Sequence, residues 1–246
     1  MAQRPLQTFV FSLFATLALI IGGAGLAQAD AERWKRQGWK TDFARKTIEF
    51  REILSGGPPK DGIPSIDQPQ FKPVSAITDL TDNEPVVSLT IAGIARSYPL
   101  RILIWHEIVN DTIAKVPVTV TYCPLCNSAI AFDRRVDGRT LDFGTTGKLR
   151  NSDLVMYDRT TESWWQQFTG EAIVGEMVGK ALKMLPARLE SFAQFKARSP
   201  DGEVLVPNKP NLRRYGENPY VGYDSAAKPF LYNGAMPAGI NPMARV

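Results

Sequence analysis

Residues 118–134, VTVTYCPLCNSAIAFDR, carry the clearest signal of the fold. In the first half of this stretch, apolar residues at 118, 120 and 122 alternate with two threonines and a cysteine. This period of two is typical of a half-buried β-strand. Its second half, AIAFDR, returns to β character after a short polar turn. The stretch therefore predicts a strand that ends in a turn, with Cys123 and Cys126 where the chain changes direction.

Short β patterns continue on both sides of this stretch. Asp137-Gly138, between AIAFDR and RTLDFG, is a strong hairpin signal. The other strand patterns are VVSLTI (86–91), GIARSY (93–98), LVMYDR (154–159), AIVGEM (172–177) and ALKMLP (181–186).

Helical spacing is confined to three segments. TDFARKTIEFREIL (41–54) has Phe43, Phe50 and Leu54 at helical spacing, with Gly56-Gly57 to end it. PLRILIWHEIVND (99–111) has a proline suited to a first helical position, and ARLESFAQFKA (187–197) is the third. Gly- and Pro-rich connections predominate in residues 56–73 and 200–246.

The composition describes an ordinary globular protein. Of 246 residues, 44% are hydrophobic and 22% charged, which excludes disorder, collagen-like repeats and coiled coil. The 19 glycines and 18 prolines favour turn-rich β structure. We therefore expect a mainly β (α+β) fold: a single, mostly antiparallel β domain with a few peripheral helices and long Gly/Pro-rich loops.

Charge and motifs exclude several functions. The 29 basic and 25 acidic side chains give +4, spread along the chain without a basic run, so we expect no nucleic-acid partner. Neither a GxGxxG fingerprint nor a P-loop occurs, so no nucleotide cofactor is expected. The single histidine rules out sites that need two or three histidines from one chain.

Residues 1–29 have the layout of a secretory signal peptide. Arg4 precedes an apolar run from Phe9 to Ile21, and Ala27-Gln28-Ala29 forms an A-x-A box. The run is shorter than the ~20 residues that span a bilayer. We expect cleavage near Ala29, a periplasmic or secreted mature chain, and no stable membrane insertion after cleavage; the alternative is an uncleaved anchor.

Three long motifs resemble one family. They are YPLRILIWHEIVND (98–111), VTVTYCPLCNSAIAFDR (118–134) and LDFGTTGKLRNSDLVMYDRTTESWWQQFTGEAIVGEM (141–177). Together with LPARLESFAQFK, PNKPNLRRYGENPYVGYD and PFLY, these motifs are similar to the DUF3179 family of exported or membrane-anchored proteins, which carries no assigned activity. The resemblance implies a β-rich domain over 74–246. The residue patterns before it predict an N-terminal helix and extended linker over 30–73. Relatives continue past the segment matching NPMARV, so we expect final strands beyond Val246 and marginal stability without them.

The CPLC turn is the main candidate for chemistry. Two thiols at this spacing can hold a soft metal, and His106 lies on the helix predicted just before the cysteine-bearing strand. Cys123, Cys126 and His106 would then bind zinc or copper, with Met156 or Glu107 as the fourth ligand.

Two alternatives stay open at the sequence level. Cys123 and Cys126 are also candidate catalytic residues of a thiol–disulfide oxidoreductase. In a third interpretation they form a structural disulfide, and a non-catalytic ligand groove lies near Lys148, Arg150 and Trp164. A polar cluster surrounds that last candidate and consists of Asp133, Arg134, Asp142, Lys148, Arg150, Asn151, Ser152, Asp153, Asp158, Arg159 and Glu162.

Overall fold

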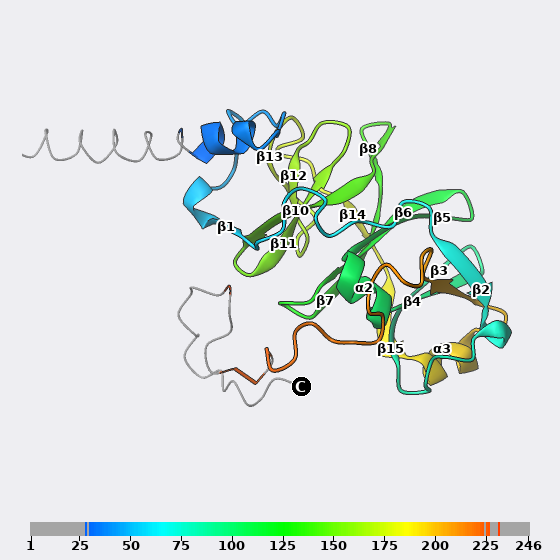
Figure 1. Ribbon diagram of the computed structural model, residues 1–246. Helices are drawn as coiled ribbons and strands as arrows, with labels where there is room; N and C mark the ends of the chain where they lie inside the picture. Colours follow the sequence, from blue (N-terminus) through cyan, green and yellow to red (C-terminus); the bar gives the residue numbers. More distant parts are fainter. Residues whose placement is uncertain (1–27, 29, 224, 227–230, 232–246) are drawn as a thin grey trace, which may run out of the picture.

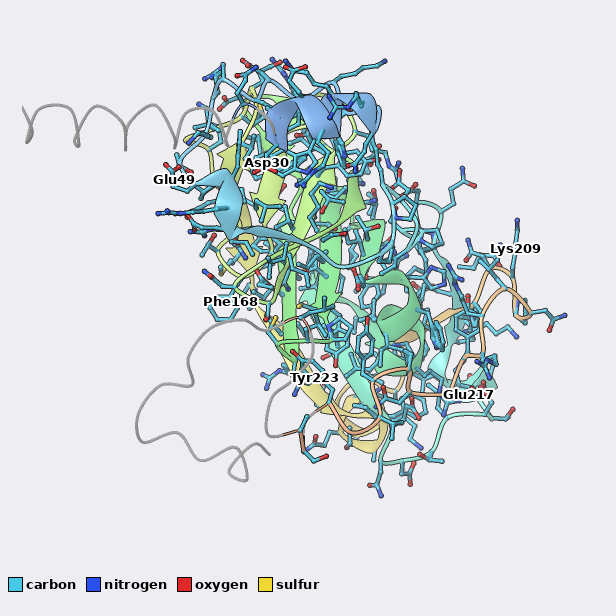
Figure 2. All side chains as sticks on the ribbon, turned by 60° about the vertical axis from the view of Figure 1, so that its left-hand side comes forward. Asp30, Glu49, Phe168, Lys209, Glu217 and Tyr223 are labelled. Atoms are coloured by element: carbon cyan, nitrogen blue, oxygen red, sulfur yellow. The ribbon has the colours of Figure 1, made fainter. Side chains whose placement is uncertain are left out.

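The computed structural model describes residues 28, 30–223, 225, 226 and 231 (Figure 1). Of the expected signal peptide only Gln28 is described, and continuous description begins at Asp30, which is labelled in Figure 2. The strands expected beyond Val246 lie outside these residues. Within the described part, no helix is both long enough and apolar enough to cross a membrane. The prediction of a mainly β fold with antiparallel sheets and short helices is confirmed.

Within the described ranges, the strands form three sheets and one small hairpin. The first sheet has the order β1 (Ile53–Ser55), β10 (Phe143–Arg150), β11 (Asp153–Asp158), β12 (Trp164–Gln166) and β13 (Ala172–Val174). The second has the order β14 (Lys183–Leu185), β7 (Ser128–Asp133), β6 (Val116–Cys123) and β5 (Ile108–Ile113). The third has the order β15 (Ala187–Ser191), β3 (Pro85–Ile91), β4 (Ile94–Pro99), β16 (Glu203–Val206) and β2 (Gln70–Pro73). The hairpin pairs β8 (Arg135–Val136) with β9 (Arg139–Thr140).

Most of these strands pair in antiparallel fashion, and β16 with β4 is a parallel pair. The predicted turn at Asp137-Gly138 is confirmed, because both residues have positive φ, 49° and 74°, between β8 and β9. Positive φ at both central residues is what a tight two-residue hairpin turn requires.

Alternation along β6 distributes side chains between two hydrophobic cores. Val118, Val120 and Tyr122 belong to the cluster shared with the third sheet and the helix α2 (Leu100–His106). Cys123, on the opposite face, belongs to the cluster between the first and second sheets. The alternation predicted from residues 118–123 is confirmed, and it turns Cys123 toward the first sheet. The strand is not half-buried as predicted, because Thr119 and Thr121 on the second face are buried as well.

The helix predicted over 99–111 ends earlier than expected. α2 stops at His106 because Glu107 adopts φ 59°, a left-handed conformation that breaks the helix. The rest of the segment forms β5, paired with β6 from Ile108 opposite Thr121. Backbone pairing with β6 outweighs the helical spacing, which was too short to settle the conformation.

The helix predicted over 41–54 is wrong. Residues 30–36 are helical instead, whereas 41–49 form turns that lead into a 3-10 turn, η1 (Phe50–Glu52), and then β1. A bridge between Lys46 and Val174 and the pairing of β1 with β10 hold this segment against the first sheet. Its aromatic residues pack on that sheet, so tertiary burial overrides the local periodicity.

The third predicted helix is confirmed in its second half. α3 (Phe192–Arg198) begins after Ser191, whose hydroxyl accepts from the backbone N–H of Gln194 in a capping box. The preceding ARLES segment forms β15 at the edge of the third sheet. A short 3-10 turn, η2 (Val74–Ala76), follows β2.

Candidate metal centre

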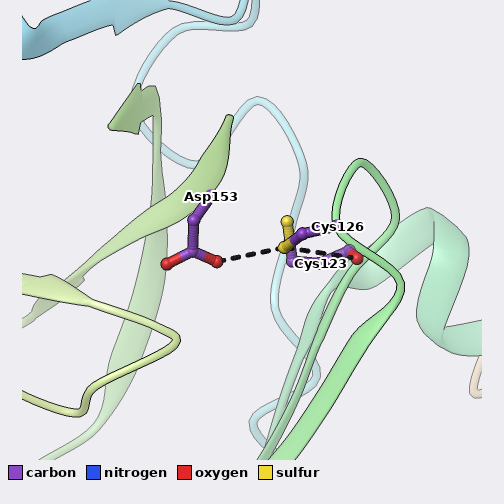
Figure 3. Close-up of side chains that lie close together, drawn as sticks. All are labelled: Cys123, Cys126 and Asp153. Carbon is purple, nitrogen blue, oxygen red and sulfur yellow. Dashed lines mark hydrogen bonds between the residues drawn. The ribbon is translucent and has the colours of Figure 1, made fainter. Parts of the chain in front are cut away.

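Two hairpin tips from different sheets meet at one point. The first is the four-residue loop between β6 and β7, which Cys123 and Ser128 close as a pair. The second is the two-residue turn Asn151-Ser152 between β10 and β11, in which both residues have positive φ. This turn places Asp153 at the start of β11, facing the cysteine loop (Figure 3).

Three acidic groups converge there. One ligand atom from each of Cys123, Cys126 and Asp153 lies within 4.8 Å of the others. The Cys126 thiol donates to Oδ1 of Asp153 over 3.3 Å, drawn as a dashed line in Figure 3. The Cys123 thiol donates to the carbonyl of Ser152 over 3.7 Å. Both cysteines are free; Cys123 is buried and Cys126 is exposed.

The carboxylate of Asp153 is held in a fixed orientation. Its Oδ2 accepts from Nε2 of Gln166 and from the backbone N–H of Phe168, the latter over 2.9 Å. Asp153 is buried, so these donors replace lost water. Oδ2 is therefore occupied, and Oδ1 is the oxygen left to face the thiols.

The electrostatics of the cluster favour a cation. The pKa of the Cys126 thiol is raised by its hydrogen bond to Cys123, then by desolvation, and further by the nearby Cys123 and Asp153 groups. All of these effects oppose formation of a thiolate by the protein groups alone. A bound cation would reverse them, because it stabilises the anionic forms of all three groups.

His106 does not belong to this convergent group. Its Nδ1 lies 2.7 Å from the carbonyl oxygen of Pro64, and its Nε2 lies 2.8 Å from the hydroxyl of Tyr215. Both ring nitrogens are therefore engaged, Nδ1 by the linker and Nε2 by Tyr215 of the C-terminal part of the chain. Burial lowers the pKa of the imidazole, which keeps it neutral in this setting. Asp153 occupies the position beside the thiols that the sequence assigned to His106.

The two predicted fourth ligands are both fully enclosed. Met156 is buried in the same hydrophobic cluster as Cys123. Glu107 is buried at the end of α2, and its backbone carbonyl accepts from the N–H of Tyr122. Burial raises the pKa of Glu107 to about 8. Glu107 is not part of the three-residue convergent group found among the described residues.

The predicted ligand groove near Lys148, Arg150 and Trp164 is filled by the protein itself. Trp164 has no exposed surface and packs on Trp34 of the N-terminal segment. Arg150 pairs with Glu52, and its guanidinium also donates to Gln166. Lys148 is buried against tryptophan rings. Lys148 and Trp164 are packing partners, and Arg150 is held by its ion pair with Glu52.

In the sequence, Asp153 belongs to the polar cluster around Lys148 and Arg150, and no pattern connects it with the cysteines. The Asn151-Ser152 pair before it was the available signal, since asparagine tolerates the left-handed conformation that a tight turn needs. Nothing in the spacing shows that this turn, on a different sheet, lies against the CPLC loop. Only the packing of the first sheet on the second brings the two together.

The fold and this site define a mainly β protein with a Cys-Cys-Asp cluster between two sheets. A family model described as a protein of unknown function, DUF3179, matches residues 60–246. The chain belongs to the DUF3179 family, as its motifs predicted. No curated protein and no solved structure matches the chain.

Proposed function

We propose that this protein binds one Zn²⁺ ion through Cys123, Cys126 and Asp153. The observation that carries the proposal is the convergence of two thiols and one oriented carboxylate within 4.8 Å. Zinc is commonly held by thiolate and carboxylate ligands at about 2.0–2.3 Å in tetrahedral sites. Small side-chain movements would bring the three atoms to such distances.

The ligand set favours zinc over copper. Cu⁺ prefers thiolate, thioether and imidazole ligands, whereas a carboxylate oxygen is a harder ligand suited to a divalent ion. A ligand set in which Asp153, rather than His106, joins the two cysteines therefore prefers Zn²⁺. Hydrogen bonds from Gln166 and Phe168 to Asp153 provide the outer support that oriented metal ligands need.

Three protein ligands leave one tetrahedral position open. Because Cys126 is exposed, the open position would face solvent. An open position is typical of zinc that binds a further ligand or activates water, while closed sites with four protein ligands are structural. The site therefore suits a binding or catalytic zinc rather than a structural one.

The test is a titration of the reduced full-length chain with Zn²⁺ against a competing chelator. We expect one ion per chain. Cys123→Ser, Cys126→Ser and Asp153→Asn should each weaken affinity by at least about 100-fold, because loss of an outer-shell partner alone costs 10–100-fold. Glu176→Gln is the matched control. Glu176 is an exposed residue that pairs with Arg139 and does not belong to the cluster, so its variant should leave zinc affinity unchanged. His106→Gln should also retain affinity.

Two results would contradict the proposal. One is the absence of stoichiometric Zn²⁺ binding by the reduced chain. The other is binding that survives Asp153→Asn and Cys126→Ser but is lost in His106→Gln, which would restore a site built on His106.

A thiol–disulfide oxidoreductase is the second candidate. The pairing of exposed Cys126 with buried Cys123 favours it, since an attacking thiol must be reachable. The raised pKa of Cys126 opposes it, because the thiolate is the nucleophile. Turnover of a small disulfide substrate by metal-free protein, lost in Cys126→Ser, would favour this function over zinc binding.

We further propose that the chain acts outside the cytoplasm, after cleavage near Ala29. The support is the charge, apolar run and A-x-A box of residues 1–29. Bound zinc would then keep the two thiols from oxidising in a compartment that favours disulfides. N-terminal sequencing of exported protein should begin at Asp30; Met1 on membrane-bound protein would indicate an anchor.

A further inference from the structure

A cleft of about 640 Å³ lies at the edge of the third sheet, beside β2, which is labelled in Figure 1. Its volume is within the range of small-molecule sites. The paired strands β2 and β16 supply part of its lining, with Lys72 opposite Val204 and Gln70 opposite Val206. Opposed residues, and residues two apart on one strand, point to the same side of a sheet. These four side chains therefore share one face, and the cleft lies over it.

Two loops complete the cleft. Residues 76–80, which begin at the end of η2, contribute the half-buried Ile77 and Leu80. Residues 207–215, which follow β16, contribute a second set of contacts that ends at Tyr215. Apolar side chains therefore enter the cleft from both loops as well as from the strands, and they offer a surface on which an aliphatic group can be buried.

The aromatic part of the lining is held by the single histidine of the chain. The hydroxyl of Tyr215 lies 2.8 Å from Nε2 of His106, and the two rings stack with their centroids 5.8 Å apart. The other ring nitrogen of His106 lies 2.7 Å from the carbonyl oxygen of Pro64. His106 therefore positions Tyr215, and a ligand that touches Tyr215 should also change the surroundings of the imidazole.

Three charged side chains line the cleft, and two of them are unpaired. Among the described residues, Lys72 has no acid and Asp79 no base within ion-pair distance, and both are exposed. The third, Arg101, is engaged by Glu84: its Nη2 donates to Oε2 over 2.6 Å and its Nε to Oε1 over 2.8 Å. Its Nη1 donates to the backbone carbonyl of Asp79 over 3.1 Å. Arg101 also interacts with the charge of Asp79, but its ion pair is with Glu84.

A free cation and a free anion beside an apolar surface favour a zwitterion. A simple carboxylate would be attracted by Lys72 but repelled by Asp79, and a simple amine would meet the opposite combination. A molecule that carries both charges and an aliphatic side chain complements all of these features. The volume of the cleft suits a short peptide better than a single amino acid.

We propose that this cleft binds short peptides that have free termini and aliphatic side chains. Lys72 pairs with the terminal carboxylate, Asp79 pairs with the terminal ammonium, and the side chains of the peptide pack on Ile77 and Leu80. Among the described residues, the lining includes no member of the cysteine cluster, so the site is separate from the proposed zinc site.

The test is a titration of the full-length chain with the dipeptide alanyl-leucine. Equilibrium dialysis measures binding, and the proton NMR resonance of the single histidine locates it, because His106 contacts Tyr215. We expect saturable binding with a Kd of about 1 mM, typical of a ligand with so few atoms. Alanyl-leucinamide lacks the carboxylate and N-acetyl-alanyl-leucine lacks the ammonium. Each should bind about 5-fold more weakly, which is the contribution of one exposed ion pair.

Two variants assign the charges. Lys72→Gln should weaken binding of the dipeptide about 5-fold and should no longer distinguish it from the amide. Asp79→Asn should do the same for the dipeptide and the acetylated form. Both residues are exposed, so the variants should fold like the unaltered chain. Lys115→Gln is the matched control, since Lys115 is an exposed lysine between β5 and β6 and does not line the cleft.

Three results would overturn the proposal. The first is the absence of saturable binding up to about 10 mM dipeptide. The second is equal affinity for the dipeptide and both of its singly charged analogues. The third is binding that Lys72→Gln and Asp79→Asn leave as tight as in Lys115→Gln.

Discussion

A carboxyl group that is fully enclosed must carry a proton at neutral pH or find a counter-charge. Glu107 is such a group, placed at the end of α2 with a left-handed backbone. Burial raises its pKa to about 8 from an ordinary value near 4.5. A helix end would normally favour a basic residue. Glu107 therefore lowers the stability of the folded chain wherever the unfolded chain would ionise it.

Glu107→Gln should stabilise the metal-free chain at neutral pH. The folded pKa lies above the unfolded one, so the native state favours the proton, and the associated stability is present below about pH 4.5 and lost as the pH rises toward 8. At pH 7 the variant should gain about 2–3 kcal/mol in free energy of unfolding. Urea unfolding at pH 4.5 and 7 measures this. An equal gain at both pH values would contradict the ionisation argument.

Among the elements, β10 depends on one glycine. Gly147 has φ 67° at a shift in the register between β10 and β11. A Cβ at this position would lie 1.9 Å from the carbonyl oxygen of Pro58, part of the linker that crosses the sheet. The glycine therefore permits a bulge and a close crossing of two backbones.

Gly147→Ala should lower the free energy of unfolding by about 2–4 kcal/mol, because it combines left-handed strain with a backbone clash. Gly179→Ala is the control: its φ is 91°, but nothing lies within 4 Å of the added Cβ. That variant should cost about 1–2 kcal/mol. Thermal unfolding of both variants gives the comparison, and equal losses would show that the crossing of Pro58 is not rigid.

In the whole molecule, the N-terminal segment before residue 60 completes a hydrophobic core on the first sheet. The region matched by the family model supplies only the remaining members of this core. The matched family region begins at residue 60. Residues before it supply seven members of one hydrophobic cluster, and they pack on the outer face of the first sheet. These members are Ala31, Trp34, Trp39, Phe43, Ile48, Phe50 and Ile53. In Figure 1 the segment lies along β10 to β13, at the end of the molecule opposite α3.

A chain that begins at residue 60 should fail to fold stably. Removal of even one buried tryptophan or phenylalanine costs about 3–5 kcal/mol, and whole domains have about 5–15 kcal/mol in total. A chain that begins at Asp30 keeps the segment and should match the full-length protein. Near-UV circular dichroism and thermal unfolding compare the two; a cooperative transition in the shorter chain would show that the segment is dispensable.

Elements whose signals are local could be predicted from the order of residues alone. The alternation of residues 118–123 and the Asp137-Gly138 turn depend on neighbours a few positions apart, and both agree with the structure. The family could also be predicted from the sequence, because its motifs are long and specific.

Which groups face each other depends on how the sheets and helices pack. Residues 41–54 have helical spacing, yet pairing with β10 and burial of Phe43 and Phe50 on the first sheet outweigh it. The third group at the cysteines is Asp153 rather than His106, because the second sheet packs on the first while the helix turns its imidazole toward Pro64. Spacing along the chain carries periodicity, whereas contact between two sheets depends on the packing of both faces, which no local pattern encodes.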